Sequence, residues 1–408
     1  MSKSSPFVLS APIYYSLELT PFCNNHCPSC GNVFERRGAP LSIEGWLDVL
    51  ARIAPHAESI KITGGEPTLH PAFEQIVRAV AALGVKFTIF TNGRWQAPEK
   101  LLGFLATLPP EQFGLLISLH GPDAEAHETF TQTPGSFEET CANIRRAAQA
   151  GLRVHTSTII MRQNYNRLPE MVALAKTLRA ERAVFNRYLG PSMPAIEPDE
   201  RQIRQAIHAI ETLQKSGENV RYGNCIPQCF APSSSTGCWA GVAYCTIDPW
   251  GNVRPCNHSS TLAGNILQEP LEAIWQNESM DRWRALTPTQ CGACSQLDVC
   301  HGGCRALVEI RGNDPLIKQP VRAARPPVEL ELYQHSRPAL HCEVQREDFG
   351  FALIRGQSME FLDPQAEPLL DYLDGQHTLA QLQLALGQDA LDMVGSLYLK
   401  SLVSLEQT

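Results

Sequence analysis

Three cysteines near the N-terminus, Cys23, Cys27 and Cys30, lie in one short stretch of the chain. Three thiolates on one loop can bind three irons of a [4Fe-4S] cluster and leave the fourth iron open to a substrate or cofactor. Structural zinc takes four closed ligands instead, for which His26 would have to supply a nitrogen. The spacing therefore favours iron-based chemistry at this loop, with zinc as the alternative.

Glycine and small polar residues end three further apolar runs of the sequence. Gly64, Gly65 and Glu66 follow one run, while Asn92 and Ser118 stand at the ends of two others. Glycine leaves the backbone bare, so a ligand can approach it closely. Asn92 and Ser118 are suited to hydrogen-bond a ribose, and the alternative is that they cap the next helix.

A second region rich in cysteine lies between about residue 216 and residue 320. It holds nine of the fourteen cysteines of the chain. Its paired Cys-x2-Cys spacing is typical of iron-sulfur clusters and also of zinc knuckles, so both metals remain open. The candidate ligands are Cys238, Cys245, Cys256, Cys291, Cys294, Cys300 and Cys304.

The elements that position these residues can be predicted from hydrophobic periodicity. Six short β-branched runs alternate with longer amphipathic runs, which indicates an α/β fold with a parallel sheet covered by helices. Barrels of this kind place their chemistry in the loops after the strand C-termini, where all the motifs of this half fall. The expected strands are Ile13–Leu19, Ser59–Thr63, Lys86–Thr91, Gly114–Leu119, Arg153–Met161 and Ala183–Tyr188. The expected helices include Pro71–Leu83, Pro98–Leu108, Phe137–Ala150 and Leu168–Ala180.

Length and charge narrow the class of protein. A chain of 408 residues predicts two or three domains, and its net charge of -8 argues against binding to nucleic acid. The first residues contain no apolar stretch typical of a signal peptide, and no run approaches the ~18 apolar residues of a membrane span. Fourteen cysteines without a secretory signal favour metal binding over disulfides. We therefore expect a cytoplasmic protein with no membrane partner.

The run Cys23-x3-Cys27-x2-Cys30 after a first strand resembles the signature of radical S-adenosylmethionine (SAM) enzymes. The resemblance implies that the three cysteines hold a catalytic [4Fe-4S] cluster whose open iron binds the amino and carboxylate groups of SAM. Cleavage of SAM would then give a 5′-deoxyadenosyl radical, so the cofactor carries the hard chemistry.

The same resemblance implies a partial (β/α)6 barrel and a role for the residues at its strand ends. Gly64, Gly65 and Glu66 would help to seat SAM, with the glycine backbone facing the methionine amino group. Asn92 and Ser118 would contact the ribose.

The cysteines from residue 238 to residue 304 resemble the SPASM extension, which carries auxiliary iron-sulfur clusters in radical SAM enzymes. The ligands that this implies for one cluster are Cys238, Cys256 and Cys304, with Cys245 as the fourth. The ligands implied for the other cluster are Cys291, Cys294 and Cys300.

The chain departs from the SPASM pattern at its end, where one more cysteine is usual near an Asp-Pro. Here the sequence reads Asp314-Pro315-Leu316-Ile317. The second auxiliary cluster is thereby left with an open iron, with a ligand from Cys225 or Cys229, or with reduced occupancy. Cys342 is a further candidate, although its alternating surroundings favour a thiol in a core.

The last seventy residues resemble PqqD, the small peptide chaperone of pyrroloquinoline quinone biosynthesis, in the segments 340–355 and 370–379. That winged-helix-like α+β fold has a three-stranded sheet on three helices. The resemblance implies that the domain binds a precursor peptide by adding its leader as an extra strand, because backbone hydrogen bonds supply the affinity. A plain cap without peptide binding is the alternative.

These features together predict four segments and one activity. The segments are a barrel at 1–215, a SPASM domain at 216–320, a linker at 321–337 and a peptide-recognition domain at 338–408. The activity is that of a radical SAM/SPASM peptide maturase, which would form a thioether, a cross-link or an epimerised residue in a ribosomally made precursor peptide. The family implies a flavodoxin or ferredoxin as electron donor. The alternatives are a small-molecule enzyme such as one of haem synthesis, a sulfatase-type maturase, and a non-catalytic iron-sulfur protein.

Overall fold

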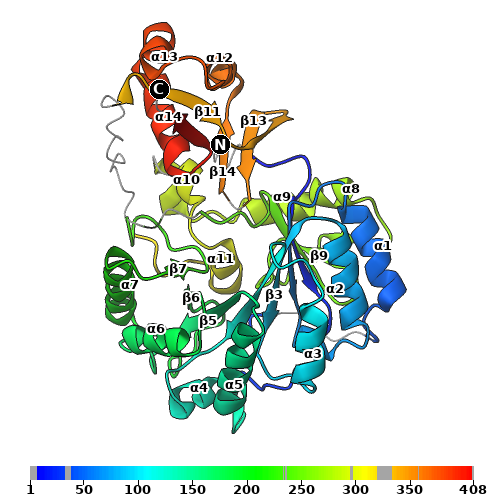
Figure 1. The fold of residues 1–408 in the computed structure, drawn as a ribbon. Helices are drawn as coiled ribbons and strands as arrows, with labels where there is room; N and C mark the ends of the chain where they lie inside the picture. Colours follow the sequence, from blue (N-terminus) through cyan, green and yellow to red (C-terminus); the bar gives the residue numbers. More distant parts are fainter. Residues whose placement is uncertain are drawn as a thin grey trace. The chain divides into compact units, whose positions relative to one another are not determined.

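The computed structural model describes residues 7–32, 38–232, 234, 237–294, 297–318, 333–356 and 358–406. The chain forms two compact units, one mainly of Ala11–Val321 and one of Arg322–Thr408 together with Pro6–Ser10 (Figure 1). The predicted linker at 321–337 falls mostly outside the described residues. Among the residues that are described, no helix has the length and hydrophobicity needed to cross a lipid bilayer.

A ten-stranded sheet organises the first unit. Its strands are β1 (Tyr14–Glu18), β2 (Ser59–Thr63), β3 (Lys86–Thr91), β4 (Phe113–Ser118), β5 (Val154–Ile160), β6 (Arg182–Arg187), β7 (Val220–Tyr222), β8 (Tyr244–Ile247), β9 (Asn252–Arg254) and β10 (Gly264–Asn265). Strands β1 to β7 are neighbours in chain order and run parallel. On the other side of β1, β8 pairs with it in parallel, and β9 and β10 continue the sheet in antiparallel pairs.

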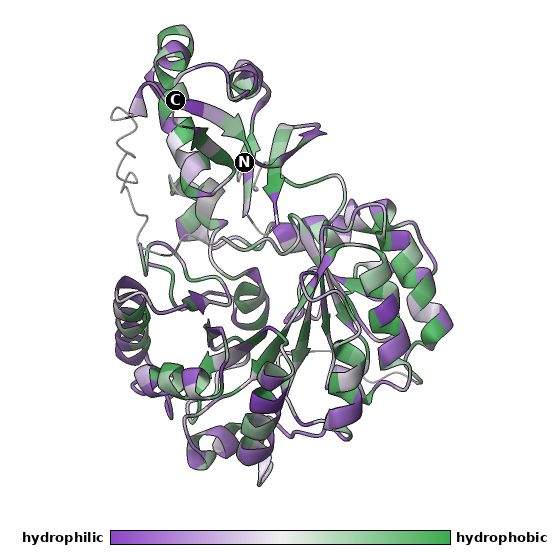
Figure 2. Ribbon diagram, viewed as in Figure 1, coloured by the Kyte–Doolittle hydropathy of each residue, from purple (hydrophilic) through white to green (hydrophobic). Residues whose placement is uncertain are grey.

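Helices connect the parallel strands and cover the sheet, and Figure 2 shows hydrophobic strands beside helices with hydrophilic outer turns. Between the parallel strands lie α1 (Ile43–Ile53), the 3-10 turn η1 (Pro67–Leu69), α2 (Phe73–Ala82), α3 (Pro98–Leu105), α4 (Ala124–Thr131), α5 (Ser136–Gln149), α6 (Leu168–Thr177) and α7 (Glu200–Lys215). After β10 follow α8 (Leu271–Trp275), α9 (Glu278–Arg284), the 3-10 turn η2 (Thr289–Ala293), α10 (Leu297–Cys300) and α11 (Arg305–Arg311). Helix α7 illustrates the local rules. It begins at a capping box between Asp199 and Gln202, and it buries one apolar face.

The prediction of an α/β fold with a parallel sheet is confirmed, and each of the six predicted strands has its counterpart in β1 to β6. The ends of neighbouring strands are level, because Glu18 pairs with Thr63 and Thr91 pairs with Ile117. The loops that carry the predicted motifs therefore meet at one edge of the sheet.

Strands β8, β9 and β10 were not predicted. They are two to four residues long and lie among the cysteines, so they are too short for an alternating pattern to stand out. Their consequence for the site is large. The β8 to β1 pairing, with Ile247 opposite Leu17, brings the cysteine-rich region beside the strand that leads into the first cysteine loop.

The second unit contains two small antiparallel sheets and three helices. Its elements are β11 (Arg337–Leu340) paired with β15 (Val403–Glu406), the sheet of β12 (Glu343–Glu347), β13 (Gly350–Arg355) and β14 (Ser358–Leu362), a 3-10 turn η4 (Pro364–Ala366), and helices α12 (Glu367–Asp371), α13 (Leu379–Leu386) and α14 (Gln388–Leu399). A core of leucines, with Phe351 and Val394, joins the sheet of β12, β13 and β14 to the three helices. This unit therefore has a core of its own, as an independent domain requires.

Residues 7–10 belong to the second unit although they begin the described chain. The Phe7 ring lies 5.1 Å from the ring of Phe349 and 5.7 Å from that of Phe361, measured between centroids. The backbone N–H of Ser10 donates to the carboxylate of Glu347 at 3.0 Å. Aromatic packing and one charge-assisted hydrogen bond thus attach this segment to the sheet of β12, β13 and β14.

Candidate active site and metal centres

One pocket at the carboxyl ends of the parallel strands collects most of the predicted site residues. Those that line it are Cys23, Cys27, Cys30, Gly64, Gly65, Asn92 and Ser118. Its empty volume is about 1150 Å³ with the open mouth included, so the three cysteines face a space that is open to solvent. His26 is exposed and is not among the lining residues.

Arg94 holds the cysteine loop in place. Its Nη1 donates to the carbonyl of Asn24 at 2.5 Å and to Oδ1 of Asn25 at 3.0 Å, while its Nε donates to Glu139 at 2.8 Å. In return, Asn24 Nδ2 donates to the Arg94 carbonyl at 2.8 Å. These bonds brace the segment between Cys23 and Cys27, so Arg94 positions two of the thiols. Sequence analysis did not identify Arg94, since its only local signal is its place shortly after Asn92.

The glycine turn after β2 packs directly on the backbone that leads into the cysteine loop. The N–H of Gly65 donates to the Thr20 carbonyl, and the N–H of Glu66 donates to the Phe22 carbonyl, both at 2.7 Å. A Cβ added to Gly65 would lie 2.1 Å from the Phe22 carbonyl oxygen, and one added to Gly64 would lie 2.8 Å from that of Thr20. Both glycines are therefore needed for backbone to pack on backbone.

Glu66 is fully buried and braces two loops from within. Its carboxylate accepts hydrogen bonds from the Thr68 hydroxyl at 2.7 Å, the Thr91 hydroxyl at 2.8 Å and the Asn92 N–H at 2.7 Å. Burial raises the pKa of Glu66, and these hydrogen bonds oppose the rise. Glu66 is absent from the pocket lining, so the structure gives it a positioning role between β2 and β3.

Asn92 and Ser118 differ in how their side chains are used. Asn92 Nδ2 donates to Asn24 Oδ1 at 2.6 Å and lies 3.7 Å from Cys23 Sγ, and its Oδ1 accepts the Arg94 N–H at 2.8 Å. These contacts make Asn92 a support for the cysteine loop as well as a pocket residue. Ser118 ends β4, is half-buried and lines the same pocket.

A charged network that sequence analysis did not predict forms another wall of the pocket. Lys61 Nζ donates to Asn257 Oδ1 at 3.2 Å and lies 4.2 Å from the centre of the Phe90 ring. Asn257 Nδ2 in turn donates to Glu18 at 2.7 Å, and Glu18 forms a fully buried ion pair with Arg254. Burial lowers the pKa of Lys61. Both Lys61 and Asn257 line the pocket, so an amine and an amide are available there to bind a polar group.

A first group of four cysteines lies in one buried cluster near this wall. Its members are Cys225, Cys238, Cys256 and Cys304. Hydrogen bonds with Cys238 and Cys304 lower the pKa of Cys225, and the Arg187 guanidinium lowers it further. Arg187 Nη2 lies 3.8 Å from Cys225 Sγ and forms a buried ion pair with Asp314 at 2.6 Å.

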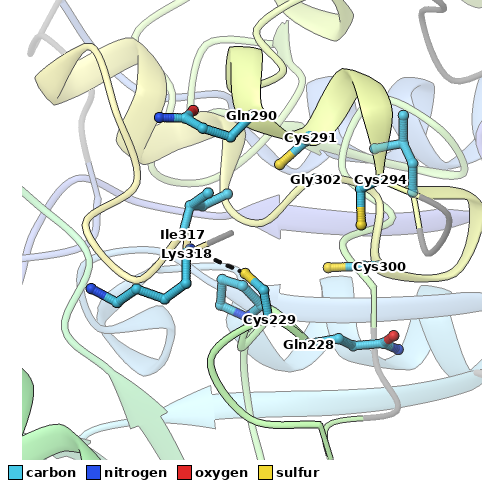
Figure 3. A pocket seen from close by; sticks show the side chains of 11 residues that line it. Gln228, Cys229, Gln290, Cys291, Cys294, Cys300, Gly302, Ile317 and Lys318 are labelled. Atoms are coloured by element: carbon cyan, nitrogen blue, oxygen red, sulfur yellow. Dashed lines mark hydrogen bonds between the residues drawn. The ribbon is translucent and has the colours of Figure 1, made fainter. Parts of the chain in front are cut away.

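A second group of four cysteines surrounds a smaller pocket, and Figure 3 shows their sulfur atoms turned toward a common space. Its members are Cys229, Cys291, Cys294 and Cys300. The backbone N–H of Lys318 donates to Cys229 Sγ at 3.2 Å. Burial raises the pKa of Cys291 to about 12, and the neighbouring thiols of Cys300, Cys229 and Cys294 act in the same direction.

The structure does not bring every predicted ligand to these groups. Cys245 lies in β8, fully buried and opposite Tyr15 of β1, and belongs to neither group. Cys342 packs against the core of the second unit. Among the described side chains, no three or more His, Cys, Asp or Glu are spaced to bind one metal ion. A [4Fe-4S] cluster is larger than a single ion and takes its four thiolates on four different irons.

Comparison with known proteins adds to this geometry. A model of the radical SAM superfamily matches residues 17–175, and a model of the iron-sulfur cluster-binding SPASM domain matches residues 238–301. The mycofactocin maturase MftC of Mycobacterium tuberculosis is 32% identical over 336 residues, which cover 75% of this chain and 83% of that protein. The AdoMet-dependent heme synthase of Methanosarcina barkeri is 27% identical over 78% of this chain and 98% of its own. The PqqA peptide cyclase of Xanthomonas axonopodis is 27% identical over 79% of this chain and 90% of its own.

The fold is also shared with a solved structure, that of Streptococcus suis SuiB bound to its precursor peptide SuiA. The TM-score is 0.63 at 19% identity, over 74% of this chain and 74% of that chain. Strand order, the cysteine loop at the pocket and the matches to both families agree. This chain belongs to the radical SAM superfamily and carries an iron-sulfur cluster-binding SPASM domain.

Proposed function

We propose that this protein is a radical SAM peptide maturase that modifies a ribosomally made precursor peptide. The observation that carries the proposal is the pocket at the strand ends, where three cysteines of one loop line an open pocket together with the glycine turn, Asn92 and Ser118. A [4Fe-4S] cluster bound by Cys23, Cys27 and Cys30 would supply, with SAM, the 5′-deoxyadenosyl radical that abstracts a hydrogen atom.

The residues around the pocket fit this assignment. Arg94 and Asn92 hold the cysteine loop, and the two-glycine turn fixes its backbone. Ser118, which ends β4 and lines the same pocket, is the proposed ribose contact. Lys61 offers its amine to a carboxylate of SAM or of the substrate. Flavodoxin or ferredoxin is the proposed electron donor.

The peptide substrate is proposed from the relatives and from the second unit. Two relatives are named a maturase and a peptide cyclase, and both are matched over more than four fifths of their length. In the second unit, β12 forms an edge of its sheet and exposes Glu343, Val344 and Arg346. An accessible edge strand can accept a peptide as a further strand, with main-chain hydrogen bonds supplying affinity. We assign leader binding to this PqqD-like unit.

A small-molecule substrate is the second candidate, because the heme synthase relative matches this chain over almost its whole own length. That match leaves about a fifth of this chain outside it. A tetrapyrrole enzyme has no use for an edge strand that binds peptides, so the second unit favours the peptide.

The test is anaerobic binding of the short peptide encoded nearest this gene, measured with the full protein and with a version that ends at Arg325. We expect a Kd on the order of micromolar, about -8 kcal/mol, for the full protein and loss of binding on truncation. Equal iron content and equal SAM cleavage without peptide in the two proteins are the matched control. Equal binding by both proteins would contradict recognition by the second unit, and no binding by either would favour the small-molecule candidate.

A further inference from the structure

Two cysteines that precede the SPASM match lie four residues apart in one loop. The match begins at Cys238, whereas Cys225 and Cys229 lie upstream, between β7 and β8. The loop turns tightly around the second of them, because the N–H groups of Phe230 and Ala231 both donate to the Pro227 carbonyl, at 2.9 and 3.0 Å. This turn separates the two thiols, so that each can face a different site.

Cys225 faces the first auxiliary group. It is buried in the cluster that contains Cys304 and contacts Cys238 and Cys256. Its thiol also donates to the Gly303 carbonyl at 3.6 Å. Cys225 thus completes a set of four cysteines, in the place that the sequence pattern had suggested for Cys245.

Cys229 faces the second group. It lines the same pocket as Cys291, Cys294 and Cys300, and in Figure 3 its sulfur points toward theirs. Its neighbour Gln228 directs a backbone hydrogen bond at the Cys300 thiol, so the loop and the Cys-x2-Cys-x5-Cys segment are in direct contact. The Lys318 N–H bond to Cys229, at 3.2 Å, is of the kind that stabilises a ligating thiolate.

Asp314, the carboxylate that follows the SPASM cysteines, is not available as a ligand of the second cluster. Asp314 is fully buried, and each of its oxygens accepts two hydrogen bonds. Arg187 donates to both oxygens at 2.7 and 2.6 Å, the Leu316 N–H donates to Oδ1 at 3.1 Å, and the Cys304 N–H donates to Oδ2 at 2.9 Å. Asp314 therefore positions Arg187 and Cys304, and the missing downstream ligand has to come from elsewhere.

We propose that Cys229 is the fourth cysteine ligand of the second auxiliary iron-sulfur cluster, and that Cys225 completes the first. Four cysteines form the full ligand set of a [4Fe-4S] cluster. Both auxiliary sites are then closed by protein, and neither leaves an iron open to coordinate a substrate atom. The loop 225–229 replaces the cysteine that the pattern lacks at its end.

The test uses a Cys23→Ala/Cys27→Ala/Cys30→Ala background, which removes the catalytic cluster and leaves the auxiliary sites. After anaerobic reconstitution this protein should hold about eight irons and eight sulfides per chain, four for each cluster. Adding Cys229→Ala should lower the iron content to about four. The proposal is also supported if the Cys229→Ala protein retains its iron but shows a changed EPR spectrum. That spectrum should change further when a small thiol is added, because the thiol can bind the iron that has lost its cysteine.

Controls keep the result interpretable. Cys141→Ala, a buried thiol of α5 outside both groups, and Cys245→Ala should keep about eight irons and an unchanged spectrum. The irons retained by the Cys225 group report that the Cys229→Ala protein is folded. Combining Cys229→Ala with Cys291→Ala should remove no more iron than either alone, because both would act on one cluster.

Three outcomes would overturn the proposal. They are an unchanged iron content and EPR spectrum in Cys229→Ala, an additive iron loss in the double variant, and zinc without sulfide bound at the second group. None of the readouts uses a peptide, so this inference and the proposed function can fail separately.

Discussion

A single methyl group at position 65 should disable the catalytic loop. In Gly65→Ala the new Cβ would lie 2.1 Å from the Phe22 carbonyl oxygen and 2.5 Å from the Phe22 carbonyl carbon. Real Cβ contacts essentially never fall below 3.0 Å, so the oxygen has to move from 2.1 to 3.0 Å, a shift of about 0.9 Å. Both contacts are backbone atoms, so no side-chain rotation relieves them. The backbone that carries Cys23 must therefore move.

A displacement of about 1 Å at a reacting group costs on the order of 100-fold in rate, and overpacking of this kind costs about 1–3 kcal/mol of stability. We expect Gly65→Ala to cleave SAM at least 100-fold more slowly than the wild type. The assay is 5′-deoxyadenosine formation under anaerobic reducing conditions, followed by chromatography. Iron analysis of the same samples should show loss of catalytic-cluster iron, while the auxiliary iron is retained.

Gly103→Ala is the matched control. It also adds one methyl group to a glycine of the first unit, but Gly103 lies within α3, and a Cβ added there would meet no atom from outside its own helix turn within 4 Å. Alanine should stabilise that helix by up to ~1 kcal/mol and leave SAM cleavage unchanged. A Gly65→Ala protein with full iron and a rate within twofold of the wild type would refute the reasoning from backbone contact.

Three further predictions concern buried ionisable groups. Asp314→Asn leaves the Arg187 guanidinium buried without its counter-ion and should lower the free energy of urea unfolding by about 3–5 kcal/mol. Arg187→Met/Asp314→Asn should recover part of this loss, because no unpaired guanidinium remains; a loss below about 1 kcal/mol in Asp314→Asn contradicts the prediction. Burial lowers the pKa of His120 to about 3 and that of His127 to about 4. The contribution of each neutral histidine to the free energy of unfolding is therefore complete above the unfolded pKa of ~6.5. It is lost as pH falls below that value, because the unfolded chain then binds protons that the folded chain does not. Each histidine should add about 1 kcal/mol per pH unit to the slope of the free energy of unfolding between pH 6.5 and 5, and His127→Gln should remove the share of one histidine; an unchanged slope counts against the prediction. Lys61→Met should keep its iron and raise KM for SAM or for the peptide about tenfold, because the proposed hydrogen bond from Lys61 in the pocket to a carboxylate would be lost, and a hydrogen bond to a charged group is worth about 1.5–3 kcal/mol. Unchanged kinetics would assign Lys61 to structure alone.

The prediction of an α/β fold with a parallel sheet rested on local patterns. The strands β1 to β6 are short, largely apolar runs, and each is followed by a helix with a buried apolar face. The motifs at Cys23, Gly64 and Asn92 are local as well, so their place at the strand ends followed from the strands. The predicted strands agree with the structure because their prediction required no knowledge of contacts between distant residues.

Contacts between residues that are distant in the chain could not be predicted from the sequence. Cys225 and Cys245 are both cysteines of the same region, and only the folded chain shows that the first joins Cys304 while the second is buried in β8. Glu66 matched the motif expected to seat SAM, yet its carboxylate is occupied by Thr91 and Asn92. The spacing of residues in the sequence identifies candidate ligands, whereas the tertiary fold determines which of these candidates lie in contact.

Arg94 and Lys61 show a second limit. Neither belongs to a cluster of chemically suggestive residues in the sequence, and each acquires its role through a partner more than sixty residues away. A cation on a strand or turn is usually a solvated surface residue, so only burial and hydrogen bonding distinguish these two.

The most direct test of the proposed peptide maturase incubates the reconstituted protein with SAM, a reductant and the peptide encoded nearest its gene. The products are followed by mass spectrometry, with Cys27→Ala as the control that removes one ligand of the catalytic cluster. We predict 5′-deoxyadenosine together with a modified peptide, seen as a mass change or, for an epimerised residue, by chiral amino-acid analysis, and the loss of both in Cys27→Ala. Formation of 5′-deoxyadenosine by the wild type with a peptide of unchanged mass, sequence linkage and stereochemistry would contradict this function.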